Sequence, residues 1–103
     1  MSLPIERTTI MNTIHSTTTE LVDSVCKTAE SLSLRYDLYA ILSPDDSIHS
    51  YGLRVTVKNR DEEEYAYAPD IARTRKDAQR IFRTMADGLV TPCTFFEILD
   101  ELL

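Results

Sequence analysis

Few residues of this chain could carry out acid–base chemistry, and they lie far apart in the sequence. His15 and His49 are the two histidines among the 103 residues, and either could act as a general base. Neither has a recognisable catalytic partner nearby in the sequence, and His49 lies at the start of a predicted strand beside Ser50. An exposed polar role is therefore the favoured interpretation for both.

The run of four carboxylates at residues 61–64 is a second candidate for chemistry. Carboxylate oxygens are ligands that Ca²⁺ and Mg²⁺ prefer, but the spacing of a calcium-binding loop is missing. The alternative, a solvated hairpin tip whose charges discourage edge-to-edge aggregation, is favoured.

Cys26 and Cys93 form no zinc motif, and we expect each to be a small buried apolar residue. With Gly52 and Gly88 as the only glycines, a glycine-rich phosphate loop is excluded. The sequence thus predicts no catalytic residue, no metal site and no cofactor.

The strongest concentration of positive charge lies between Arg73 and Arg83. Five cations and Asp77 give this segment a net charge of +4, whereas the whole chain carries −6 and is a poor candidate for a general nucleic-acid binder. On a helical wheel, Lys76, Arg80 and Arg83 form a stripe opposite the apolar positions. The stripe could contact a nucleic-acid backbone or an acidic partner, or be a solvated helix face, which is the favoured interpretation. A further alternative is contact with the acidic face of another copy, formed by Glu97, Asp100 and Glu101.

The elements that position these residues begin with a predicted sheet. Residues 31–42 and 47–58 alternate between apolar and polar side chains, which predicts two strands that each have one dry face. A turn at 43–47 joins them, and a turn at 59–62 leads to a short third strand that Pro69 ends. All five tyrosines fall in these strands. A cluster of them on the face without helices could stack a ligand or a nucleobase, but core or sheet positions are favoured.

The N-terminal third fits more than one structure. Residues 4–16 suit a strand or a loosely attached arm. Thr17 and Glu20 are spaced as in a capping box and a helical apolar pattern follows, yet residues 17–29 could equally pair as a strand. We therefore divide the chain into an N-terminal arm, strand or helix over residues 1–30 and a single α+β domain over residues 31–103.

Two helices are predicted after the strands. In the first, Thr74 is the N-terminal cap, Gly88 takes the left-handed position after the last turn, and the apolar positions are Ala78, Ile81, Phe82, Met85 and Ala86. In the second, Thr94 and Glu97 form a capping box. Its apolar residues cover about 160° of the helix surface: Phe95, Phe96, Ile98, Leu99, Leu102 and Leu103. So wide an arc predicts a helix that completes the core or reaches a second subunit.

The predicted fold class is α+β, an antiparallel meander of three or four strands followed by two C-terminal helices packed on one face. Four stretches carry a family resemblance: LRYDLYAIL, SYGLRVTV, DIARTRKDAQRIF and the closing GLVTPCTFFEILDELL. They resemble a family of short uncharacterised proteins from Clostridia-type Firmicutes, a domain of unknown function, over about residues 34–103. The resemblance implies this fold and a bacterial cytosolic setting, and it offers no catalytic residues to carry over.

For function, we expect a small interaction or regulatory module without enzymatic activity that self-associates. The candidate interaction surface comprises Arg75, Lys76, Arg80, Arg83, Phe95, Phe96 and Leu99. The alternative is a nucleic-acid or nucleotide-binding accessory protein that uses the Arg-rich helix face, and the third hypothesis is a small enzyme that uses His49 or the carboxylates at 61–64. A homo-oligomer or an acidic protein is the expected partner. A cytoplasmic location is expected because the sequence has neither a membrane-spanning apolar run nor a signal peptide.

Overall fold

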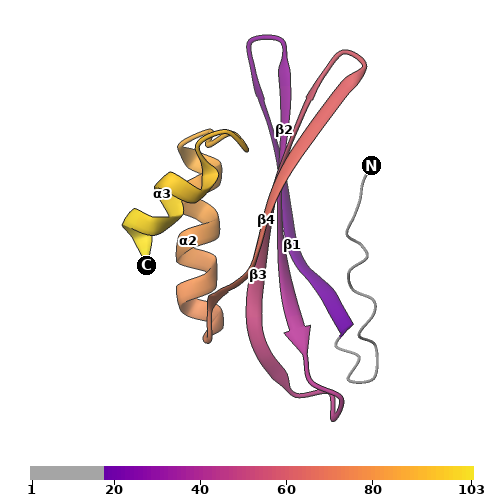
Figure 1. The fold of residues 1–103 in the computed structure, drawn as a ribbon, viewed down its shortest axis with the longest axis vertical. Helices are drawn as coiled ribbons and strands as arrows, with labels where there is room; N and C mark the ends of the chain where they lie inside the picture. The colour runs from indigo at the N-terminus through magenta and orange to yellow at the C-terminus, as the bar shows by residue number, and fades with distance from the viewer. Residues whose placement is uncertain (1–17) are drawn as a thin grey trace.

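A four-stranded antiparallel sheet forms one layer of the computed structural model, which describes residues 18–103. The strands are β1 (Thr18–Ala29), β2 (Leu32–Leu42), β3 (Ile48–Asn59) and β4 (Glu62–Ala72), and they lie side by side in chain order. Helices α2 (Arg75–Asp87) and α3 (Phe95–Leu102) follow, and both lie on the same face of the sheet (Figure 1). The predicted α+β fold is confirmed, with four strands in the meander.

β1 resolves the ambiguity over the described part of this segment, because residues 18–29 form a strand that pairs with β2 on both sides of one irregularity. The helical interpretation is wrong for a specific reason. The register shifts between Leu21 and Asp23, which leaves Val22 in a bulge. Val22 and Val25 therefore both pack against the core, although alternation would place them on opposite faces. The two apolar residues are therefore three positions apart on one face of a strand, a spacing that is also typical of a helix.

The dry face predicted for β2 and β3 is confirmed. Seven residues of this face are at most 3% exposed, and they form the centre of the core: Leu34, Tyr36, Leu38, Ala40, Tyr51, Leu53 and Val55. Their alternation with polar neighbours follows the two-residue repeat of a strand that has one side against the core.

β4 is longer than predicted, because Pro69 does not end it. Leu53 pairs with Ala68 and Tyr51 pairs with Ala72, so three residues of β4 lie opposite one residue of β3. Pro69 lies in this bulge, on the last strand in the order of the sheet. Its missing N–H therefore costs no hydrogen bond of the regular ladder, and the strand continues.

α2 begins as predicted and ends one residue later than predicted. Thr74 accepts a hydrogen bond of 3.2 Å from the Asp77 N–H, and the five predicted apolar residues are the buried ones. Gly88, however, has a φ of −85°, and Leu89 takes the left-handed conformation with a φ of 53°. The Val90 N–H bonds to the Met85 carbonyl in a Schellman motif, and Val90 is buried. Burial of Val90 thus places a leucine where glycine is the usual residue.

α3 begins without the predicted capping box, since the Thr94 side chain makes no capping hydrogen bond. The backbone of Thr94 has φ −108° and ψ 2°, outside the extended region that a capping residue usually adopts. Phe95 and Leu99 are buried, but Phe96 is 54% exposed and Leu103 is also exposed. The apolar arc of this helix is therefore divided between the core and the surface.

Tyr36 joins the sheet to the segment that connects the two helices. Its Oη donates a buried hydrogen bond of 2.8 Å to the carbonyl oxygen of Val90. Desolvation raises the pKa of Tyr36 to about 12, because the phenolate would have to form inside the core. One side chain of β2 thus anchors the segment that connects α2 to α3.

The Tyr36→Phe variant should lower the free energy of unfolding by about 1–3 kcal/mol, because the buried Val90 carbonyl loses its donor. Urea unfolding measures this change. Tyr65→Phe is the matched control, since the Tyr65 ring is exposed, and its effect should stay within about 0.5 kcal/mol. Equal effects of the two variants would contradict the role given to Tyr36.

The pH dependence of stability gives a second readout for the same variant. The unfolded chain loses the Tyr36 proton near pH 10, about the usual pKa of tyrosine, whereas the folded protein keeps it up to about pH 12. Stability that is fully present below pH 10 is therefore lost as the pH rises from 10 to 12. Tyr36→Phe should remove this part of the alkaline loss.

Candidate functional site

The cations predicted to form a binding surface lie together on the outer side of α2. Arg75, Lys76, Arg80 and Arg83 are all exposed. Within residues 18–103, the ion pairs join Lys27 to Asp87 and both Arg35 and Arg54 to Asp37. The α2 stripe, as we call these four residues, is therefore not neutralised by carboxylates in the described part of the chain.

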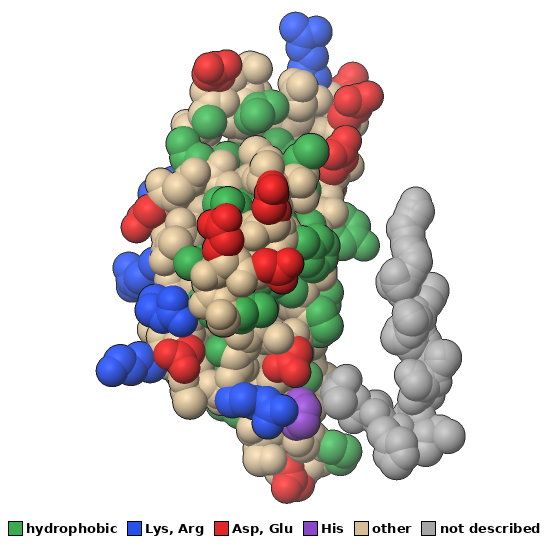
Figure 2. All heavy atoms as spheres, turned by 60° about the vertical axis from the view of Figure 1, so that its left-hand side comes forward, with side chains coloured by type: hydrophobic (Ala, Val, Ile, Leu, Met, Phe, Trp, Pro, Cys, Tyr) green, Lys and Arg blue, Asp and Glu red, His purple; other side chains and the backbone are tan. Residues whose placement is uncertain are grey.

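Acidic and apolar side chains on α3 border this stripe. Glu97, Asp100 and Glu101 are exposed, as are Phe96 and Leu103. Figure 2 shows Lys and Arg side chains along one side of the helical face, with Asp and Glu side chains nearer its centre. The outer face of the two helices thus presents both signs of charge around exposed apolar groups.

Two residues of the predicted interaction surface belong to the core. Phe95 and Leu99 are buried under α3, with exposures of 0% and 5%. Phe96 remains accessible, and its ring packs edge-on against that of Phe95 with centroids 4.9 Å apart. The surface that a partner can reach therefore consists of the α2 stripe and Phe96, because Phe95 and Leu99 are part of the buried core.

The other residues singled out in the sequence do not assemble into a reactive site. His49 is exposed on β3, and His15 lies outside the described residues. Glu62 and Glu64 border an open hollow of about 210 Å³ together with Cys93, but no histidine lines it. Among residues 18–103, no three His, Cys, Asp or Glu side chains are grouped to hold a metal ion. Cys26 and Cys93 are exposed, so their predicted burial is wrong.

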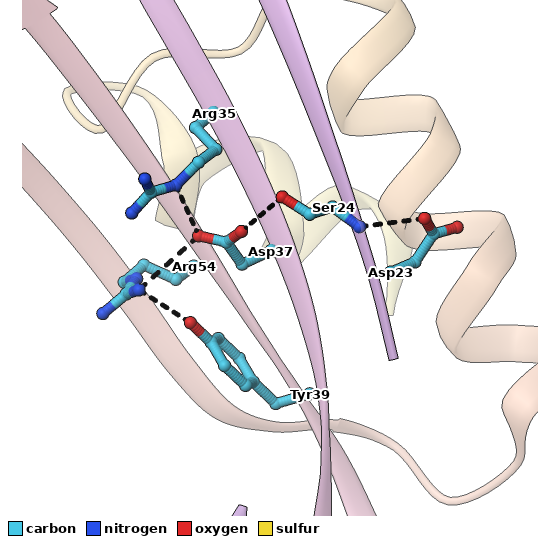
Figure 3. A network of polar contacts seen from close by, with 6 residues as sticks. All are labelled: Asp23, Ser24, Arg35, Asp37, Tyr39 and Arg54. Carbon is cyan, nitrogen blue, oxygen red and sulfur yellow. Dashed lines mark hydrogen bonds and ion pairs between the residues drawn. The ribbon is translucent and has the colours of Figure 1, made fainter. Parts of the chain in front are cut away.

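A polar network on the opposite, helix-free face of the sheet was not predicted from the sequence. Strand pairing places Ser24, Asp37, Arg54 and Tyr67 in one row across all four strands. Figure 3 shows two arginines reaching the carboxylate of Asp37 and Ser24 reaching it from the neighbouring strand. The available signal was a pair of opposite charges, Arg35 and Asp37, in the middle of a mostly apolar strand.

Asp37 is the centre of this network and is only 3% exposed. Its Oδ1 accepts a hydrogen bond of 2.7 Å from the Ser24 hydroxyl. Its Oδ2 accepts one of 3.0 Å from Arg35 Nε and lies 3.5 Å from Arg54 Nη2. The hydrogen bond and the charge of Asp37 raise the pKa of Arg35. A carboxylate buried on a sheet face is thus satisfied by three neighbours, as burial of charge requires.

Two tyrosines extend the network from Arg54. Arg54 Nη2 donates a hydrogen bond of 2.7 Å to the Tyr39 hydroxyl. Its guanidinium carbon is 5.5 Å from the Tyr39 ring centre, so the contact with the hydroxyl is the closer one. The Tyr39 and Tyr67 rings pack edge to face with centroids 6.2 Å apart, and burial raises the pKa of both. Gly52 makes room for Tyr67, because a Cβ there would lie 2.8 Å from the Tyr67 hydroxyl oxygen.

Comparison with known proteins gives a family but no activity. A family model, described as a family of unknown function, matches residues 15–103 of this chain. The chain belongs to the DUF6514 family. Searches of curated proteins and of solved structures gave no match. Within the described residues, no helix of this DUF6514 protein is both long and apolar enough to cross a membrane.

The Asp37→Asn variant should lower the free energy of unfolding by about 1–3 kcal/mol, because two arginines lose their shared anion. The expected loss of stability is smaller than for a fully buried ion pair, since both guanidinium groups are partly exposed. Chemical unfolding measures the change in the free energy of unfolding. Glu63→Gln, an exposed carboxylate change on the adjacent strand pair, is the control and should be nearly neutral. An Asp37→Asn protein as stable as the control would show that the network contributes little.

Proposed function

We propose that this DUF6514 protein is a small interaction module that self-associates through the outer face of α2 and α3 and has no catalytic activity of its own. The observation that carries the proposal is the α2 stripe lying beside the acidic residues of α3 on one face. Such a face is complementary to itself. As part of the proposal, the module acts in the bacterial cytoplasm, as the sequence resemblance implies.

Two-fold symmetry would use this arrangement twice. In a symmetric dimer the same patch meets itself, so α2 of one copy faces α3 of the other and the reverse contact follows. The α2 stripe would then approach Glu97, Asp100 and Glu101 of the second copy. Phe96 and Leu103 would lose contact with water between these charges, and an aromatic group near the centre of an interface commonly contributes much of its affinity.

The chemistry of the same face makes nucleic acid the weaker candidate for the α2 stripe. Phosphates would be attracted by four cations but repelled by three neighbouring carboxylates. The net charge of the chain, −6, adds long-range repulsion at low salt. Binding of a polyanion that is lost when the α2 stripe is reversed would favour this alternative over self-association.

A charge-exchange experiment tests the proposal. Arg80→Glu with Arg83→Glu makes the helical face acidic, and Glu97→Lys with Glu101→Lys makes it basic. We expect the wild-type protein to associate across the micromolar range in sedimentation equilibrium, and each double variant alone to remain monomeric through like-charge repulsion. An equimolar mixture of the two variants should associate again, because every contact then joins opposite charges.

The control reverses two cations elsewhere, Lys58→Glu with Arg60→Glu at the β3–β4 hairpin. It shifts the net charge as much as the first variant does, and it should leave association unchanged. Circular dichroism should show that all variants remain folded. A wild-type protein that stays monomeric, or a mixture that does not associate, would overturn the proposal.

A further inference from the structure

We propose a second binding surface, the helix-free face of the sheet, with single-stranded nucleic acid as its ligand. Side chains of β2, β3 and β4 that point away from the helices form it: Arg35, Tyr39, Arg54, Lys58, Tyr65 and Tyr67. In this surface the tyrosine rings stack on bases and the cations contact phosphates. Proteins that bind single strands without strong sequence preference combine these two kinds of group.

The strand register places aromatic rings in three successive rows of this surface. Tyr39 pairs with Gly52 in the first row, Arg54 pairs with Tyr67 in the second, and Thr56 pairs with Tyr65 in the third. Tyr65 is 55% exposed, and both described helices lie on the other side of the sheet (Figure 1). An extended strand of nucleic acid can therefore follow β4 across the rows and meet a ring in each.

The same rows carry the positive charge. Arg35 and Arg54 lie in the third and second rows, and Lys58 pairs with Glu63 in the next row. On the described part of this face, three cations stand against Asp37 and Glu63, which leaves a net charge of +1 on a chain of −6. α3, which carries further acidic residues, lies with α2 on the opposite face of the sheet (Figure 1), so the cations of this face are closer to a ligand bound here.

Asp37 prepares both guanidinium groups for an anion. Arg35 binds Asp37 through Nε and Arg54 binds it through Nη2. Among residues 18–103, no hydrogen bond occupies the two Nη groups of Arg35 or Nη1 of Arg54, whereas Arg54 Nε lacks a partner but is buried. Arg54 is also held by the Tyr39 hydroxyl at 2.7 Å. Side chains fixed before binding lose less conformational entropy when a ligand arrives, which favours a binding role over a purely solvated one.

The binding measurement uses fluorescence anisotropy of labelled single-stranded DNA and RNA of mixed sequence, with the full chain at low salt. We expect binding that weakens as salt is added, and weaker binding of the matching duplex, whose bases are already stacked. The chain has five tyrosines and no tryptophan, so quenching of its intrinsic fluorescence reports directly on the tyrosines.

Variants separate the two faces of the protein. Tyr65→Ala should weaken binding roughly 5- to 100-fold through loss of one stacking contact. Lys58→Glu should weaken it for all sequences and reduce the salt dependence by about one phosphate contact. The control, Arg80→Glu with Arg83→Glu on α2, should leave binding unchanged even where it abolishes self-association.

Failure of this inference is distinguishable from failure of the proposed self-association, since different variants test them. Absence of binding to DNA and RNA at low salt would overturn the proposed nucleic-acid surface. Binding that survives Tyr65→Ala but is lost in the α2 variant would also overturn it and assign the nucleic acid to the helical face. A Tyr65→Ala protein with unchanged thermal stability shows that its loss of binding is not a loss of fold.

Discussion

The apolar face of the sheet is the constraint on which the rest of this structure depends. Burying a large apolar side chain contributes about 1.5–3 kcal/mol, and exposing this face to water would forfeit that contribution many times over. α2 covers it with a continuous row of apolar residues, and Phe95 and Leu99 of α3 complete the cover. α3 has eight residues, too few for a helix to be stable in isolation, so its packing on the core is what maintains it.

Covering one face of the sheet leaves two surfaces with different chemistry. The outer side of the helices carries both signs of charge around Phe96, which suits a second copy of the same chain. The open side of the sheet carries tyrosines and two arginines held by Asp37, which suits an anionic, planar ligand. The exposed residues of each surface, such as Arg80, Phe96 and Tyr65, lie outside the buried core, so changes to them should lower stability less than changes to the core do.

Sequence periodicity predicted the elements whose pattern is regular and failed where a local irregularity intervened. The dry faces of β2 and β3 and the buried side of α2 follow repeats of two and 3.6 residues, and all were confirmed. The bulges at Val22 and Pro69 break the repeat of two, so one strand looked helical and another looked short. The Asp37 network depends on the register between strands far apart in sequence, which periodicity within one strand does not contain.

The most direct test of the central claim compares adjacent residues, Phe95→Ala and Phe96→Ala, by chemical unfolding of dilute protein. Phe95 is fully buried in the core and Phe96 is half-exposed. Truncating Phe95 should therefore lower the free energy of unfolding by about 3–5 kcal/mol, whereas truncating Phe96 should cost less than about 1 kcal/mol. Equal losses, or a larger loss for Phe96→Ala, would contradict the role of α3 as the cover that completes the core.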